Sequence, residues 1–353
     1  MGFAKNKQGK RDVAIGLDLG TSQVKAVVLR AVGNTLQIAE FAVMPFTAVV
    51  GKAGDEQKFA EELQQVMGKL SVADRNVSVT ISCPSAIICM ADIPRMPVVE
   101  ARSAFRMQVN SMRYLRRDLS NYHLDVAELE NSPAGEKAKK SATMRILVGA
   151  AGREEVRWYR AALLAAKIRP DVMELASVSI TNAFQLTHKE LCEKENILLV
   201  DVGSRTTAIN FLRYGQPWLT RIMHFGGAQI SEYLAQVLSL DAVAAEEEKV
   251  KMSETVQPLV RAAMQPLAKE VRASVDFFER QQECQVGHAF ACGGSACGRG
   301  VLDSLGADVG MKIEKWDPIQ GFDTSPLSAQ AAQLEKVGPS LAAAIGAAAV
   351  RLE

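Results

Sequence analysis

The chain has 353 residues, enough for about two domains that each bury a core of their own. Its 41 lysines and arginines nearly balance its 40 aspartates and glutamates, so bulk electrostatics do not favour a nucleic-acid or membrane-surface binder. The apolar runs are shorter than the roughly 20 residues of a membrane span, and the cysteines lack the spacing of a zinc site. We therefore expect a cytoplasmic protein with reduced thiols.

The N-terminal part of the chain alternates between strand and helix patterns. A basic, polar tail precedes two runs of β-branched residues that predict a hairpin. In the segments that follow, apolar residues recur either every second residue, as in strands, or every three to four residues, as in helices. The pattern predicts strands at 13–17, 24–29, 36–43 and 76–82, and amphipathic helices at 56–70, 154–166 and 172–186.

A separate block follows the fourth strand. Strand patterns at 86–93, 122–129 and 144–151 surround a proline-opened helix at 98–115 and a polar loop. This block has the composition of a small α+β insertion with its own sheet. The sequence thus divides into a flexible tail (1–11), a first lobe (12–85 and 152–195), an inserted subdomain (86–151) and a second lobe (196–353).

One short pattern stands at the head of each lobe. "GLDLGTS" (Gly16 to Ser22) and "LVDVGSRTT" (Leu199 to Thr207) both read as an apolar strand, Asp-x-Gly and a hydroxyl-bearing turn. A single copy is typical of an ordinary hairpin, but two copies indicate an internal duplication. Two such turns that face each other can hold a polyphosphate with their amides, while Asp18 and Asp201 orient a hydrated magnesium ion.

A third glycine-rich turn lies in the second lobe. "AFACGGSACGRG" (Ala289 to Gly300) predicts a strand, a Gly-Gly-Ser turn and a helix whose free amides can meet a nucleoside or phosphate. In this order the three turns resemble those of the actin, hexokinase and heat-shock-chaperone ATPase superfamily. That resemblance implies an α/β, actin-like, two-lobed ATPase fold made of duplicated ribonuclease H-like domains, here with a small α+β insertion in the first lobe.

Within this superfamily the chain resembles the FtsA and PilM branch, specifically the PilM family of type IV pilus assembly. The specific part is the pair of Asp-Gly turns, the Gly-Gly-Ser turn and "FGGAQIS" (Phe225 to Ser231); "AAEEEKVK" (Ala244 to Lys251) is compatible with it. The resemblance implies ATP and Mg²⁺ as ligands, with Asp18 and Asp201 at the metal. The nucleotide would contact Gly20, Thr21, Ser22 and Lys25 from one lobe, and Gly203, Ser204, Arg205, Thr206, Thr207, Gly226, Gly227, Glu247, Lys249, Gly293, Gly294 and Ser295 from the other.

Two features of this site stay open at the level of sequence. The register of Glu246, Glu247 and Glu248 against the family pattern is ambiguous, and these residues with Lys249 or Lys251 also fit a solvated helix face. Arg205 either clamps a phosphate or forms a surface salt bridge.

Hydrolysis requires a side chain that orients the attacking water. The best candidate is Glu174, although a glutamate near a helix start is often a dipole partner. The sequence therefore predicts nucleotide binding with slow or negligible turnover.

The leading hypothesis is an ATP-binding scaffold of an inner-membrane pilus or related type II secretion complex. Members of this family receive the cytoplasmic N-terminal peptide of a PilN-like membrane protein in a groove that involves the inserted subdomain, and nucleotide would gate the lobes. This predicts a protein that is peripheral to the inner membrane through its partners and that can form homo-oligomers. The alternatives are a small-molecule kinase, which needs a catalytic base at an acceptor pocket, and an FtsA-like division filament, which we expect to carry a C-terminal amphipathic helix absent after "VRLE".

Overall fold

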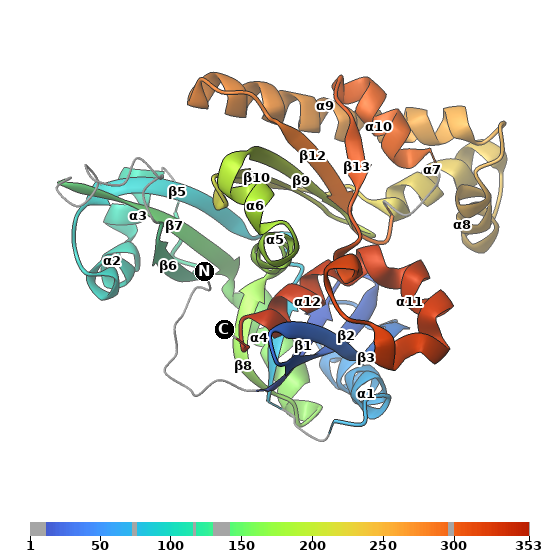
Figure 1. Ribbon diagram of the computed structural model, residues 1–353, viewed down its shortest axis with the longest axis horizontal. Helices are drawn as coiled ribbons and strands as arrows, with labels where there is room; N and C mark the ends of the chain where they lie inside the picture. Colours follow the sequence, from blue (N-terminus) through green and yellow to red (C-terminus); the bar gives the residue numbers. More distant parts are fainter. Residues whose placement is uncertain (1–11, 73–75, 116–117, 130–141, 296–299, 353) are drawn as a thin grey trace.

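Two five-stranded sheets with the same topology organise the molecule (Figure 1). The computed structural model describes residues 12–352 except 73–75, 116–117, 130–141 and 296–299. In each sheet three antiparallel strands are followed by two strands that run parallel to the first. The first sheet has the order β3 (Thr35–Pro45), β2 (Gln23–Val32), β1 (Val13–Leu19), β4 (Asn76–Ile81), β8 (Arg169–Leu175), and the second the order β11 (Gln216–Met223), β10 (Thr207–Arg213), β9 (Asn196–Val202), β12 (His288–Cys292), β13 (Ile313–Lys315).

The repeated order confirms the duplication that the two Asp-Gly turns predicted. Strands β1 and β9 take equivalent central positions, and both carry the aspartate of their turn near the carboxyl end of the strand. The carboxyl ends of parallel strands are where α/β sheets bind ligands. Duplication therefore places two equivalent turns at the functional edges of two equivalent sheets.

Helices cover the outer face of each sheet. Phe59 of α1 (Asp55–Gly68) and Trp158 of α4 (Arg153–Ala165) are buried against alternate residues of β1, including Leu17. The second sheet packs in the same way against the helices of its own half. These are α7 (Gly227–Leu238), α8 (Ala242–Lys251), the long α9 (Gln257–Gln282) and α10 (Val301–Val309).

Two helices lie between the sheets. Helix α5 (Ala176–Thr187) and helix α12 (Ala342–Ala349) share one core cluster with residues of β1 and β9, and all eight residues of α12 are buried. The sequence placed α12 in the second lobe, but it packs chiefly on α5, β1 and β2 of the first. Its alanine-rich sequence permits this packing because a small side chain lets three elements approach closely. The predicted second lobe, residues 196–353, therefore includes a helix that packs mainly on elements of the first lobe.

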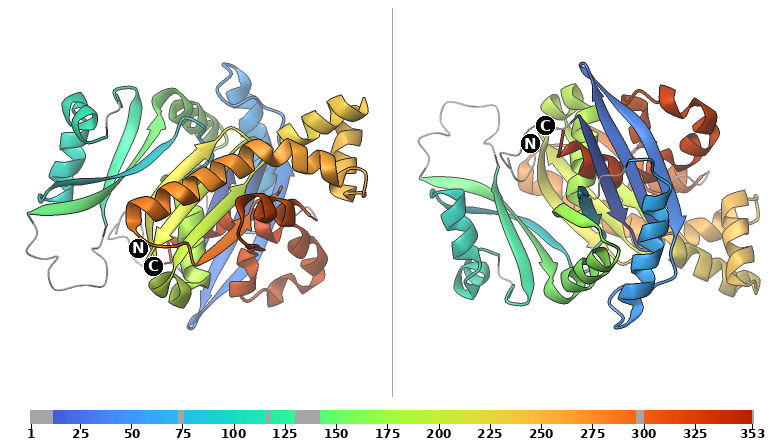
Figure 2. Two further views of the ribbon diagram at one scale, coloured as in Figure 1. Left: turned by 90° about the horizontal axis from the view of Figure 1, so that it is seen from above. Right: turned by 90° about the horizontal axis from the view of Figure 1, so that it is seen from below.

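A third sheet projects from the first lobe (Figures 1 and 2). It has the order β5 (Ile87–Pro94), β7 (Thr143–Gly152), β6 (Tyr122–Glu128), and its core residues include Ile93 and Phe105. The helix predicted at 98–115 is two helices, α2 (Val98–Phe105) and α3 (Gln108–Leu115), because the chain turns at Arg106 and Met107. The remaining short helices are α6 (Lys189–Lys194) and α11 (Ala331–Val337).

The helix predicted at 172–186 is the largest error of the secondary-structure prediction. Residues Arg169–Leu175 form strand β8, and α5 begins only at Ala176. Strand β8 is the edge of the first sheet beside the inserted subdomain, and each of its faces mixes polar and apolar residues, Asp171 with Met173 on one and Val172 with Glu174 on the other. The resulting sequence lacks the alternation that marks a half-buried strand.

Candidate functional site

The two Asp-Gly turns face each other across the space between the sheets. The turn after β1 contains Gly20, Thr21 and Ser22, and the turn after β9 contains Gly203 to Thr206. The backbone amide of Arg205 donates a hydrogen bond to the Thr21 hydroxyl at 3.3 Å, so the two turns are in direct contact. A cavity of about 20 Å³ lies behind this contact, lined by Ser82, Asp201 and Thr206 among others. The sequence therefore identified two segments that the fold brings together from 184 residues apart.

Two aspartates and a lysine form the electrostatic centre of this region. Lys25 Nζ donates to Asp18 Oδ2 at 2.8 Å, and both side chains are almost inaccessible to solvent. The other oxygen, Asp18 Oδ1, is buried and has no hydrogen-bond partner within the described part of the chain. Burial raises the pKa of Asp201 to about 6, Lys25 opposes this shift, and Asp18 adds to it. An unpartnered carboxylate oxygen beside a second, half-buried carboxylate suits a hydrated divalent cation.

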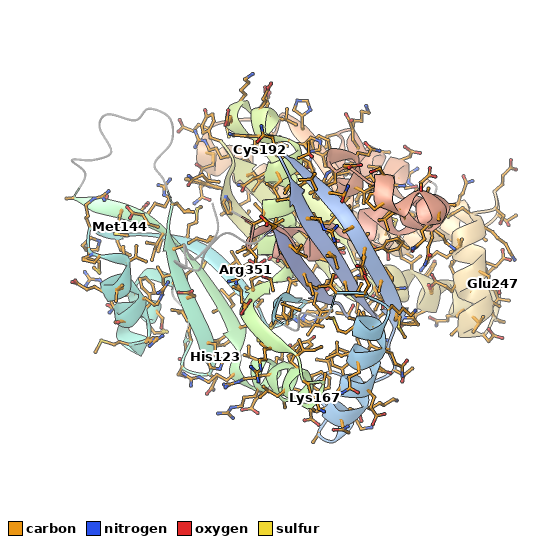
Figure 3. The ribbon with its side chains drawn as sticks, turned by 60° about the horizontal axis from the view of Figure 1, so that its bottom comes forward. His123, Met144, Lys167, Cys192, Glu247 and Arg351 are labelled. Carbon is orange, nitrogen blue, oxygen red and sulfur yellow. The ribbon has the colours of Figure 1, made fainter. Side chains whose placement is uncertain are left out.

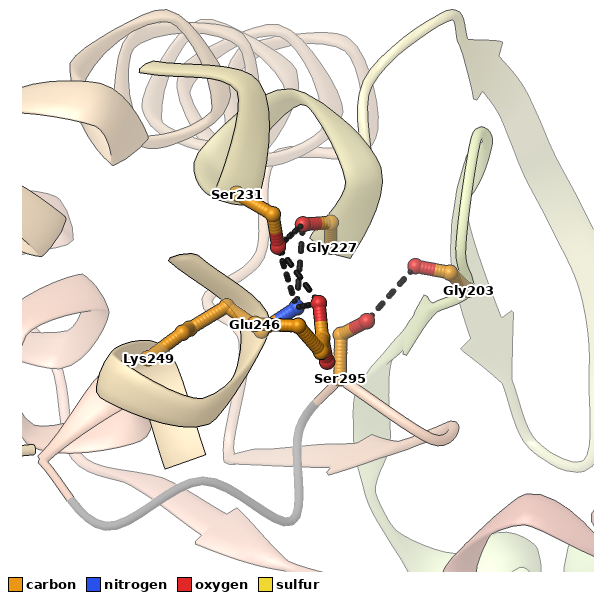
Figure 4. A network of polar contacts seen from close by, with 6 residues as sticks. All are labelled: Gly203, Gly227, Ser231, Glu246, Lys249 and Ser295. Carbon is orange, nitrogen blue, oxygen red and sulfur yellow. Dashed lines mark hydrogen bonds and ion pairs between the residues drawn. The ribbon is translucent and has the colours of Figure 1, made fainter. Parts of the chain in front are cut away.

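The second turn is held against two other glycine-rich segments (Figure 4). The amide of Gly227 donates to the carbonyl oxygen of Gly203 at 3.0 Å, and Ser295 Oγ donates to the same oxygen at 2.9 Å. A Cβ at Gly226 would overlap the carbonyl oxygens of Gly203 and Ser204, so only glycine allows this approach. The predicted residues at 203–204, 226–227 and 295 thus form one continuous backbone surface.

Lys249 is the centre of a polar network above this surface (Figure 4). Its Nζ donates to Gly227 O at 3.0 Å, to Ser231 Oγ at 2.9 Å and to Glu246 Oε2 at 2.7 Å. Ser231 also donates to Glu246 at 2.5 Å. The sequence missed Ser231, although it lies four residues after Gly227, the spacing that places two side chains on one helix face.

Glu247, the glutamate selected from the sequence, lies outside this network. Its side chain is 64% exposed, its nearest cation is Lys251 at 3.9 Å, and Figure 3 shows it on the outer side of α8. One residue along a helix rotates a side chain by about 100°, which explains why only Glu246 reaches Lys249. The network therefore favours Glu246, and contact of either glutamate with a nucleotide stays a prediction.

The remaining candidates of the two turns and the Gly-Gly-Ser segment differ in their surroundings. Thr207 is fully buried and its hydroxyl donates to Phe225 O at 2.8 Å, so it serves the packing of the turn. Arg205 is exposed, with Glu232 at 3.8 Å. Gly293 has φ of +97°, a left-handed conformation, and a Cβ there would overlap Asp201 and Val202. Gly294 follows it, with Ser340 as the nearest group to a Cβ built there.

Glu174 lies two strands away from Asp18, at the edge of the first sheet. In the first sheet it is paired with Thr80, which is paired with Asp18, so the three residues share one row across β8, β4 and β1. Ser179 of α5 donates to Glu174 Oε1 at 2.6 Å, and desolvation raises the pKa of Glu174 to about 7. Thr80 stands between Glu174 and the centre formed by Asp18, so a role in orienting water stays a prediction.

A cavity lies in the groove between the first sheet and the inserted subdomain. We call it the β6–β8 groove; it has a volume of about 270 Å³ and is lined by residues of β4 to β8, α4 and α5, and by Val350. All of its lining residues except His123, Asp125 and Glu174 are apolar or glycine. Figure 3 shows His123 on the inserted sheet and Arg351 between that sheet and the first.

The polar groups around the β6–β8 groove are mostly neutralised. Arg102 forms an ion pair with Asp125, and Arg351, which follows the lining residue Val350, forms one with Asp171 of β8 at 3.2 Å. Desolvation, with nearby arginines including Arg153, lowers the pKa of His123, so this side chain is largely uncharged at pH 7. Two carboxylates line the groove, Asp125 and Glu174. Asp125 has Arg102 as its partner, whereas the ion pairs of the described residues give Glu174 no cation.

The described residues lack two kinds of feature. They contain no cluster of three or more histidine, cysteine or acidic side chains suited to holding a metal ion. None of the helices within them is both long and apolar enough to cross a bilayer.

Comparison with known proteins assigns the chain to a family. The profile of the family described as type IV pilus assembly protein PilM matches residues 16–352. The chain belongs to the PilM family. A solved PilM-PilN type IV pilus biogenesis complex contains a chain that is 24% identical, with a TM-score of 0.84 over 98% of this chain and 100% of that one.

Other matches extend the similarity to the actin-like fold. The ethanolamine utilization protein EutJ from Carboxydothermus hydrogenoformans is 14% identical, with a TM-score of 0.58 over 98% of this chain and 91% of that one. MreB 5 of Spiroplasma citri, solved with AMPPNP bound, is 12% identical, with a TM-score of 0.50 over 93% of this chain and 97% of that one. These matches confirm the predicted two-lobed actin-like architecture of this PilM family member.

Proposed function

We propose that this PilM family protein binds Mg-ATP between its two sheets. The observation that carries this proposal is the contact of two duplicated turns beside Asp18, whose Oδ1 is buried without a partner among the described groups. A hydrated magnesium ion held by Asp18 and Asp201 would supply the charge that this oxygen lacks, and would neutralise the phosphates. The AMPPNP bound to the Spiroplasma citri MreB supports a nucleotide ligand for this fold.

The two sides of the cleft would hold different parts of the nucleotide. Backbone amides in glycine-rich turns form anion sites without charge of their own, and Lys25 adds a cation close to both turns. The Lys249 network would position the nucleoside through Glu246. We assign the phosphates to Gly20, Thr21, Ser22, Lys25, Gly203, Ser204, Arg205 and Thr206, and the nucleoside to Gly227, Glu246, Lys249, Gly293, Gly294 and Ser295.

We infer that hydrolysis is slow or negligible. The carboxylate selected for orienting water, Glu174, is bonded to Ser179 and lines the β6–β8 groove. Phosphoryl transfer to water depends on a group placed in line with the terminal phosphate. Nucleotide would then act mainly as a ligand that selects one arrangement of the lobes.

The β6–β8 groove is proposed to receive the cytoplasmic N-terminal segment of a PilN-like inner-membrane protein. The PilM-PilN complex supports the identity of the partner, and the groove offers features suited to a short extended peptide. Strand β8 is an edge of its sheet and lines the groove, so its free backbone groups can pair with an added strand. Apolar walls from both sheets can take alternate side chains. This binding would hold the protein at the inner membrane.

Calorimetric titration with the N-terminal peptide of the PilN protein from the same cell tests both ligands. We expect peptide binding by the wild-type protein, with an affinity that changes on adding Mg-ATP. Gly149→Trp fills the groove from β7 and should abolish peptide binding while ATP still binds, because Gly149 lines the groove and not the cleft. A wild-type protein that binds neither ligand would disprove the proposal, and peptide binding unaffected by Gly149→Trp would disprove the location.

A further inference from the structure

The geometry of the β6–β8 groove points to one chemical requirement for its occupant. We propose that Glu174 receives a positively charged group of the bound segment, either its α-ammonium or a lysine or arginine side chain. This inference rests on the proposed function of the groove and adds to it the residue that selects the partner.

Glu174 lies at the meeting point of three elements. It projects from β8 beside Thr80 of β4, and Ser179 of α5 donates to its Oε1 at 2.6 Å. Its exposure is intermediate and is provided by the groove, which it lines with apolar neighbours such as Val172 and Val178. One carboxylate oxygen is thus fixed by a serine, and the side chain as a whole is oriented by the protein toward a cavity.

The charges that face Glu174 leave it uncompensated. Asp125, across the groove on β6, is already paired with Arg102, and Arg351 at the end of the chain is paired with Asp171. His123, also on β6, has a lowered pKa. The ion pairs among the described residues therefore offer Glu174 no cation. Its serine partner is neutral.

An occupant that covers this carboxylate must compensate it. Burying an ionised carboxylate under an apolar peptide costs several kcal/mol unless an opposite charge or strong donor accompanies it. A charged donor makes the shorter and stronger hydrogen bond, and gives specificity because a neutral peptide leaves the carboxylate unpaired. A PilN-type segment that begins with a free amine or carries basic side chains meets this requirement.

The proposal predicts a pH dependence with a defined sign. The pKa of Glu174 in the free protein is about 7, so a cation must bind the ionised form and affinity should rise as pH increases from about 5.5 to about 7; above that an α-ammonium itself begins to lose its proton. Titration of His123 also contributes to any such profile, because it lines the same groove. The contribution of Glu174 is the difference between the pH profile of peptide affinity in the wild-type protein and that in Glu174→Gln.

The test uses three peptides from the N-terminal segment of the PilN protein of the same cell. One is unmodified, one is N-acetylated, and one has its lysines and arginines replaced by glutamine. We expect Glu174→Gln to bind the unmodified peptide at least tenfold more weakly than the wild type does. We expect Glu174→Gln and the wild type to bind one of the two neutralised peptides with the same affinity. That peptide identifies the source of the cation. Glu154→Gln, on the exposed first turn of α4, is the matched control and should change nothing.

Each other outcome has a distinct meaning. Equal binding of all peptides by wild type and Glu174→Gln, or affinity that rises as pH falls, overturns the role of Glu174 but leaves the groove as a peptide site. Absence of peptide binding by the wild type overturns the proposed function itself. If Glu174→Gln does not fold, the pH profiles of the wild type with the unmodified and neutralised peptides decide, because only the charged one should lose affinity through protonation of Glu174.

Discussion

At the scale of single residues, Asp18 combines burial with an unsatisfied oxygen. Its Oδ2 is bonded to Lys25, while Oδ1 has no partner among the described groups. A buried, unpaired acceptor usually costs about 1–3 kcal/mol, a cost that the proposed magnesium ion would offset. Thr207 has no such unpaired oxygen, because its hydroxyl already donates to Phe225 O.

Asp18→Asn should therefore remove the magnesium dependence of ATP binding. The neutral amide keeps the shape of the side chain but cannot balance the metal charge, so we expect the affinity for ATP in the presence of Mg²⁺ to fall at least tenfold. Titration with ATP in magnesium and in EDTA measures this. Asp276→Asn, in an exposed pair on α9, serves as the control. Unchanged Mg-ATP affinity in Asp18→Asn would remove the basis for a metal at this position.

Lys249 provides a second prediction at the same scale. It is 13% exposed and makes three hydrogen bonds, whereas Lys251 on the same helix is 61% exposed. Lys249→Gln should weaken nucleotide binding at least fivefold, because Glu246 and Ser231 lose the cation that positions them. Lys251→Gln should leave affinity within twofold. Equal effects of the two substitutions, measured with a fluorescent nucleotide, would show that only the net charge of α8 matters.

At the scale of elements, α12 depends on two glycines for its place between the sheets. A Cβ at Gly346 would overlap the carbonyl oxygen of Ser179 in α5, and a Cβ at Gly16 in β1 would overlap that of Ala344. Both neighbours are backbone atoms that cannot rotate away. Helix α12 is thus in close contact with a helix on one side and a strand on the other.

Gly346→Ala should consequently lower the free energy of unfolding by about 1–3 kcal/mol, as overpacking of a tight core does. Gly68→Ala, at the end of α1, is the control because a Cβ there meets open space. It should be neutral or slightly stabilising, since alanine favours the helix by up to about 1 kcal/mol. Urea denaturation followed by circular dichroism compares the two. A neutral Gly346→Ala would mean that α5 and α12 are free to separate.

Local sequence patterns predicted many of these elements, and the failures have physical causes. The turns at Asp18 and Asp201 were identifiable because duplication repeats a local pattern, and β1 and α1 follow from simple periodicity. Strand β8 was mistaken for part of a helix because its pairing with β4, a distant segment of the chain, is what makes it a strand. The same limitation hid the β6–β8 groove, which exists only where β8 meets the inserted sheet.

At the scale of the whole molecule, the described contacts connect the second sheet both to the first sheet and to the inserted one. Helices α5 and α12 lie between the first and second sheets, the Thr21 and Arg205 contact joins their turns, and β5 of the inserted sheet packs beside β11 of the second. Because the two turns touch at Thr21 and Arg205, we expect a nucleotide bound between them to change their separation. Such a movement would also change the position of β11 relative to the inserted sheet.

The contact between Arg145 and Trp218 is the specific link in the connection between β11 and the inserted sheet. Arg145 of β7 lies over the indole of Trp218 of β11 at 4.4 Å from the ring centroid, and it is held there by Asp92 at 2.9 Å. A cation over an aromatic face contributes about 0.5–1 kcal/mol at an exposed site. The free energy of this contact is therefore close to the smallest coupling free energies between two ligands, which typically amount to about 1–3 kcal/mol.

Arg145→Gln should therefore reduce the effect of Mg-ATP on peptide affinity without abolishing either binding event. We expect peptide affinity in the absence of nucleotide to stay within twofold of the wild type, and the change caused by Mg-ATP to shrink by at least half on a logarithmic scale. Because coupling free energy is reciprocal, the effect of peptide on ATP affinity must shrink equally. Arg157→Gln, an exposed arginine of α4, controls for charge. If Arg145→Gln retains the full coupling in both directions, the signal between cleft and groove passes through α5 and α12 instead.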